Sequence, residues 1–80
     1  MKCWQIIDER YPDYIVVEEI EHDYDLHAYR VSYRGKLIST IYPDTIEDMD
    51  EIVTALDNNE SPVGWGDGMG GTISMDLATC

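Results

Sequence analysis

Apolar and polar residues alternate through the first half of the chain with the period of two that is typical of β-strands. The alternation is cleanest in the third such segment, where Tyr29, Val31 and Tyr33 share one face. Arg34 and Gly35 then form a hairpin-type turn, since glycine adopts positive φ without steric cost. We therefore expect strands at Cys3–Ile7, Tyr14–Ile20, Leu26–Arg34 and Leu37–Tyr42.

The hydrophobic period lengthens to that of an α-helix after Pro43, which ends the fourth strand because proline cannot donate a hydrogen bond to a sheet. Asp44 or Thr45 can cap the start of this helix. Asn58-Asn59 is the predicted end, because asparagine tolerates the left-handed conformation found there. The apolar stripe of the helix consists of Ile46, Met49, Ile52, Val53 and Leu56.

Residues beyond the helix form a predicted loop and a last strand. Ser61–Gly71 contains Pro62 and five glycines, a composition that favours a loop. Alternation returns in Thr72–Leu77, with Ile73, Met75 and Leu77 facing inward. The expected fold is a single α+β domain over residues 1–80. It has an antiparallel sheet of four or five strands with one helix packed on one face, in the order β-β-β-β-α-β.

Charge divides the chain into two parts. The formal net charge is −12, and all five Lys and Arg residues lie within the first 36 positions. The remainder, from Leu37 to Cys80, contains nine carboxylates and no basic residue. Because like charges held together destabilise a compact state, we expect this acidic surface to bind a basic protein partner. The same charge argues against direct binding to nucleic acid or to an anionic membrane.

The predicted helix is the most concentrated part of the acidic surface. It carries about one carboxylate per 4 Å of its axis, and a single DNA strand carries one phosphate per ~3.4 Å. The two spacings are close enough for this face to compete for a DNA-binding groove. A charged face that serves only solubility is the alternative. The candidate partner-binding residues are Asp44, Glu47, Asp48, Asp50, Glu51, Asp57, Glu60, Trp65 and Asp67.

The glycine-rich loop leaves two interpretations open. Trp65 and Met69 could provide an adaptable contact for a partner, or Trp65 could fold back over the small core. The loop lacks the Lys and Ser/Thr of a phosphate-binding loop, and Asp67 would repel phosphate. Nucleotide binding is therefore not expected.

No other pattern predicts catalysis, a metal or a cofactor. The acidic segment 22–27 matches neither a calcium loop nor a zinc motif, and no serine or cysteine has a recognisable nucleophile context. Cys3 and Cys80 have no metal or redox spacing, and we expect free thiols. No apolar stretch approaches the ~18 residues of a membrane span, and the N-terminal apolar segment is too short for a signal peptide. The expected location is the cytoplasm.

A compact chain with a concentrated acidic face resembles the small phage-borne inhibitors that mimic DNA, including anti-CRISPR and anti-restriction proteins. The resemblance covers size, charge and layout, and no diagnostic motif. It implies steric and electrostatic blockade of a nuclease or its DNA-recognition site, with carboxylates at positions that normally hold phosphates. It also implies action in a bacterial cytoplasm. A toxin-neutralising immunity protein and a non-inhibitory regulatory or structural domain are the alternatives.

Overall fold

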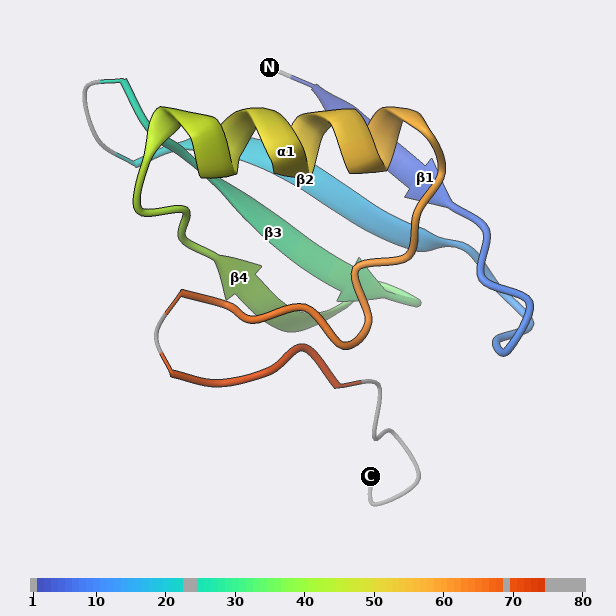
Figure 1. The fold of residues 1–80 in the computed structure, drawn as a ribbon. Helices are drawn as coiled ribbons and strands as arrows, with labels where there is room; N and C mark the ends of the chain where they lie inside the picture. The colour runs from blue at the N-terminus through green and yellow to red at the C-terminus, as the bar shows by residue number, and fades with distance from the viewer. Residues whose placement is uncertain (1, 23–24, 69, 75–80) are drawn as a thin grey trace.

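The computed structural model of this 80-residue chain describes residues 2–22, 25–68 and 70–74. They form an antiparallel sheet of four strands in the order β1-β2-β3-β4, followed by one helix (Figure 1). The predicted α+β fold, with a four-stranded sheet and a single helix, is confirmed. The elements are β1 (Cys3–Ile6), β2 (Ile15–Glu21), β3 (His27–Tyr33), β4 (Lys36–Ile41) and α1 (Ile46–Asp57).

The β3–β4 hairpin closes through the predicted two-residue turn. Tyr33 pairs with Lys36, and the two residues between them have φ angles of 53° at Arg34 and 80° at Gly35. Positive φ at both positions defines a type I′ turn, whose twist matches that of the flanking strands. The register then shifts between Val31 and Ser32, which bends β4 as a β-bulge does.

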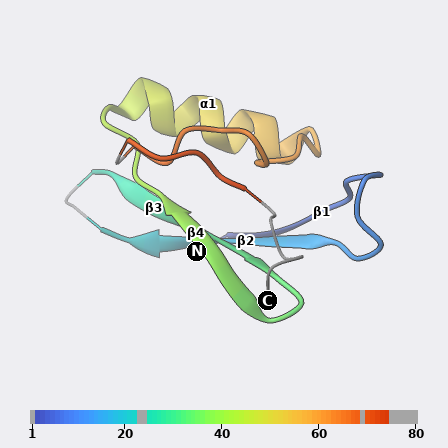
Figure 2. The same ribbon diagram turned by 90° about the horizontal axis from the view of Figure 1, so that it is seen from below.

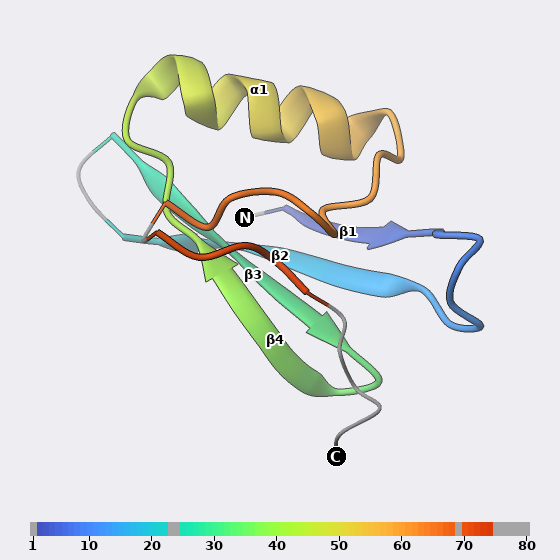
Figure 3. The same cartoon turned by 60° about the horizontal axis from the view of Figure 1, so that its bottom comes forward.

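α1 and residues 60–68 and 70–74 cover the same face of the sheet, and the core lies beneath them (Figures 2 and 3). Side chains from all four strands point into this layer and meet Leu56 of the helix and Ile73 of the C-terminal segment. Burial of this apolar surface is the main favourable term for so small a domain. The buried cluster comprises Trp4, Ile6, Ile15, Val17, Tyr29, Val31, Tyr33, Ile41, Leu56 and Ile73.

The helix begins and ends as the sequence predicts. Thr45 is the N-cap, and its side-chain oxygen accepts a hydrogen bond from the Asp48 N–H at 3.1 Å. Asn59 has a φ of 61°, the left-handed conformation expected after the last turn. The side chain of Asn59 also accepts from the backbone N–H of Ile7 at 3.1 Å and so holds the helix end against β1. Ile46, predicted as part of the apolar stripe, is 50% exposed because it lies in the first turn, away from the buried Leu56.

The predicted fifth strand is not formed in the part of the chain that the structure describes. Thr72 makes a single antiparallel bridge with Gly66, while positions 75–77 of the predicted strand lie outside the described residues. Ile73 is buried as expected, but its N–H donates to the Trp65 carbonyl oxygen at 2.8 Å. The backbone of this segment is thus satisfied by the preceding loop rather than by an edge strand of the sheet.

Asp8 is a buried carboxylate that fastens the β1–β2 connection. It accepts hydrogen bonds from Arg10 Nε at 3.0 Å and Nη2 at 2.8 Å, and from the Arg10 backbone N–H at 3.0 Å. These bonds, with one from the Ser61 side chain, hold the pKa of Asp8 far below its usual value. A lowered folded-state pKa adds stability that is present above the unfolded-state pKa and is lost as pH falls below it.

Replacing Asp8 by Asn should therefore reduce the free energy of unfolding at neutral pH by about 1–2 kcal/mol. It should also flatten the loss of stability that the native protein undergoes when pH falls below about 4. Urea unfolding at about pH 7 and about pH 3 measures both effects. Glu9→Gln, at the exposed neighbouring position, is the matched control. If the free energy of unfolding of Asp8→Asn fell as much between about pH 7 and about pH 3 as that of the native protein, this role of Asp8 would be contradicted.

Candidate functional site

A groove with a volume of about 380 Å³ separates α1 from the glycine-rich loop. Asp48 and Glu51 line it from the helix, and Trp65 lines it from the loop. Asp44 and Glu60, which precede and follow α1, complete its acidic lining. Five of the nine candidate residues therefore come together around one cavity, which the sequence did not predict. The apolar part of the lining consists of Ile41, Pro43, Ile52 and Ala55.

The loop wall of the groove is fixed to the end of β4. The backbone N–H of Tyr42 donates to the carbonyl oxygen of Asp67 at 2.9 Å. Gly68 follows with a φ of +83°, and a Cβ atom at this position would overlap the Tyr42 carbonyl oxygen. The carboxylate of Asp67 accepts from the Gly71 N–H at 3.0 Å, so it orders the loop from inside. A glycine at position 68 is consequently required for the loop to pack here.

The acidic lining of the groove has no cationic partner among residues 2–22, 25–68 and 70–74. Three basic side chains of the chain are paired with other carboxylates: Lys2 with Asp57, Arg10 with Asp8, and Arg34 with Asp13. Arg30 alternates with inward-facing residues of β3 and is exposed. Lys36 begins β4 beside the hairpin turn, at the end of the strand opposite the groove residue Ile41. The negative charge around the groove is therefore not neutralised by the described part of the fold.

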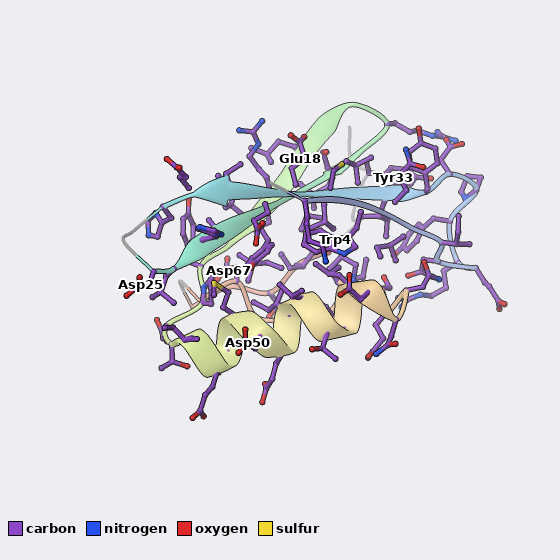
Figure 4. The ribbon with its side chains drawn as sticks, turned by 90° about the horizontal axis from the view of Figure 1, so that it is seen from above. Trp4, Glu18, Asp25, Tyr33, Asp50 and Asp67 are labelled. Atoms are coloured by element: carbon purple, nitrogen blue, oxygen red, sulfur yellow. The ribbon has the colours of Figure 1, made fainter. Side chains whose placement is uncertain are left out.

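α1 separates the predicted acidic residues into two flanks. Asp48 and Glu51 lie on the groove side, whereas the charge of Asp50 acts on Tyr29 beneath the other side. Burial, together with the charges of Glu19 and Asp50, raises the pKa of Tyr29 well above its usual value. Figure 4 shows Asp50 on α1 and Trp4 pointing from the sheet toward this helix, while Glu18 points away from the opposite face of the sheet. Glu47 is exposed and does not line the groove.

Asp57 has a structural contact that the sequence did not indicate. Its Oδ1 accepts a hydrogen bond from the indole Nε1 of Trp4 at 2.8 Å and lies 3.3 Å from Lys2 Nζ. The Trp4 hydrogen bond is the main reason that the pKa of Asp57 is lowered. These contacts tie the end of α1 to β1. Asp57 and Asp67 thus stabilise the walls near the groove but do not line it.

A second polar cluster lies on the inner face of the sheet. The Tyr29 hydroxyl donates to Glu19 Oε2 at 3.1 Å, and His27 Nδ1 lies 3.2 Å from the same oxygen without hydrogen-bond geometry. Burial by itself raises the pKa of Glu19. The contact with His27 and hydrogen bonds from Lys2 N–H and Tyr29 together outweigh burial and lower this pKa. The cluster explains how a glutamate is accommodated on the inner face of β2, next to the buried Val17.

The described residues offer little for metal binding. They contain no group of three or more His, Cys, Asp or Glu side chains placed to hold a metal ion. Positions 23 and 24 of the acidic segment 22–27 lie outside the described residues. Cys3 is a free and exposed thiol, and Cys80 lies outside the described residues. The helix in the described part of the chain lacks the length and apolar character needed to span a membrane.

Comparison of the chain with protein families, with curated proteins and with solved structures finds no match. Its function is therefore inferred from the chemistry of the groove and from the distribution of charge. The groove combines uncompensated carboxylates, a half-buried tryptophan and an apolar lining. This combination suits a cationic ligand that also has an apolar part.

Proposed function

We propose that this protein inhibits a nucleic-acid-binding protein, in particular a nuclease, by DNA mimicry. In this proposal, the groove and the carboxylates that line it, on α1 and on the segments that flank this helix, occupy a basic surface that normally binds phosphates. The observation that carries the proposal is the charge distribution. Carboxylates at Asp44, Asp48, Glu51 and Glu60 line one cavity and have no ion pair within the described residues. A partner rich in Arg and Lys would supply the missing charge.

The electrostatics favour association with such a partner. A net charge of −12 on 80 residues produces a strong negative potential, which steers a basic surface toward the protein and accelerates binding. Arginines that hold phosphates bind carboxylates with the same bidentate geometry, so the two anions compete for one site. The interactions of these arginines with carboxylates and with phosphates both weaken as the salt concentration is raised.

The half-buried Trp65 supports a second candidate, a toxin-neutralising immunity protein. Such a protein would use the tryptophan as a packed hot spot against one specific toxin. Its affinity would fall less with salt than that of a DNA mimic, because a packed apolar contact is not screened. The salt dependence of partner binding therefore separates the two candidates.

Release of proteins from DNA–cellulose tests the proposed function. Bacterial proteins retained at about 50 mM salt are washed with this protein, and the released fraction is identified by mass spectrometry. We expect specific release of one or a few DNA-binding proteins. Polyglutamate at the same carboxylate concentration is the control, because it has the charge without the groove. No release, or equal release by polyglutamate, would contradict the proposal.

A further inference from the structure

We propose that the groove between α1 and the glycine-rich loop binds a single arginine side chain of the partner, which inserts between Trp65 and the carboxylates of the helix. The inference rests on the proposed function and specifies the chemistry by which the partner is recognised. It assigns a separate role to one flank of the acidic helix. It places recognition of the partner in a defined pocket rather than on a diffuse negative surface.

The carboxylates of the groove are placed to bind a guanidinium. Asp48 and Glu51 are three residues apart on α1, so their side chains lie side by side on one face of the helix. Both line the groove, as does Glu60 from the segment that follows α1. Carboxylates contributed by two segments suit the planar, five-donor fork of arginine better than the compact ammonium of lysine.

Trp65 offers an aromatic surface in the same cavity. It is half-buried, packs against the hydrophobic core and also lines the groove. Core packing limits the motion of the ring, so little conformational entropy is lost when a ligand binds against it. A guanidinium that stacks on the ring keeps its edge free to donate hydrogen bonds to carboxylates.

The remaining lining suits the aliphatic part of an arginine side chain. Ile52 and Ala55 of the helix and Ile41 of β4 contribute apolar groups. A long cationic side chain buries its methylene stem on such a surface while its charged end meets the carboxylates. The volume of about 380 Å³ lies near the lower limit of ligand pockets, which favours one side chain over a larger ligand.

Titration with two tripeptides tests this inference without the unidentified partner. The peptides have blocked termini and a central arginine or lysine, and they carry equal charge. Binding is followed by amide chemical shifts and by the indole N–H signals of the two tryptophans in the native protein. We expect the arginine peptide to shift Trp65 and the groove amides and to bind about fivefold or more tightly than the lysine peptide.

Two variants assign the effect to the groove. Asp48→Asn/Glu51→Gln should weaken the arginine peptide by about tenfold, and Trp65→Phe should reduce its preference over lysine. As a control, Asp50→Asn removes one charge, half of what the paired variant removes, from the other flank of the same helix and should change binding less than about twofold. We expect the paired variant to fold, because it keeps the apolar stripe intact, and its spectrum checks this directly.

The outcomes separate this inference from the proposed function. Equal binding of the two peptides, or shifts spread evenly over α1 with Asp50→Asn as damaging as the paired variant, would overturn the arginine pocket. Release of proteins from DNA–cellulose would then still stand as evidence for a diffuse acidic mimic. Selective arginine binding without any such release would support the pocket and contradict DNA mimicry.

Discussion

Neutralising Asp48 and Glu51 together should raise the concentration of this protein needed to release a partner from DNA–cellulose by about tenfold to a hundredfold. Both carboxylates line the groove and have no ion pair within the described residues. In the complex they would face arginine or lysine side chains, so their loss leaves those cations partly desolvated without a counter-charge. Asp48→Asn/Glu51→Gln keeps the size of each side chain and tests charge alone.

The control for this prediction is Asp50→Asn, because Asp50 is also exposed but lies on the other flank of α1. Its effect on release should stay within about twofold. The paired variant should not unfold, since both positions are exposed and removal of two like charges relieves repulsion on the helix. Circular dichroism and thermal unfolding check this point. Unchanged release by the paired variant would return the acidic helix face to a role in solubility.

Replacing Gly68 by Ala should lower the free energy of unfolding by about 2–4 kcal/mol. The φ of +83° is strained for any residue with a side chain, and the added Cβ would overlap the Tyr42 carbonyl oxygen. The loop can avoid this overlap only by moving away from β4, which breaks the hydrogen bond from Tyr42 N–H to Asp67. Thermal unfolding should show a loss of about 10–25 °C in Tm.

Gly70→Ala provides the matched control for this loop. Gly70 has a similar φ of +91°, but no atom lies within 4 Å of an added Cβ. This variant should therefore lose only about 1 kcal/mol, the cost of the backbone conformation. The loop that carries Trp65 should also be displaced in Gly68→Ala, with weaker partner binding as a result. Equal stability of the two variants would show that the contact with Tyr42 is not what positions the loop.

Local patterns in the sequence predict most of the fold. Strand alternation, the Arg34-Gly35 turn and the helix caps depend on neighbouring residues, so their propensities are visible in a short window. The predicted last strand was wrong for the described part of residues 72–77, because alternation specifies a strand without specifying its partner. Thr72 and Ile73 pair with the preceding loop instead of the sheet.

The candidate site was only partly accessible from the sequence. Net charge and the helical period identified the exposed acids, since the first is a sum over residues and the second depends only on local spacing. The groove could not be predicted, because it depends on long-range contacts such as that between Tyr42 and Asp67. The same limit applies to Asp57, whose hydrogen bond to Trp4 joins residues 53 positions apart. An Asp at the end of a helix with no basic residue in its last turn gives no indication of such a partner.

Competition with DNA tests the central claim most directly. A protein released from DNA–cellulose is purified and bound to a fluorescently labelled duplex, and this chain is then titrated into the complex. If the acidic face replaces phosphates, the anisotropy of the duplex falls to its free value, and the midpoint rises in proportion to the concentration of duplex. Anisotropy that stays constant or rises as this chain binds would mean that protein and DNA occupy different surfaces, and would contradict DNA mimicry.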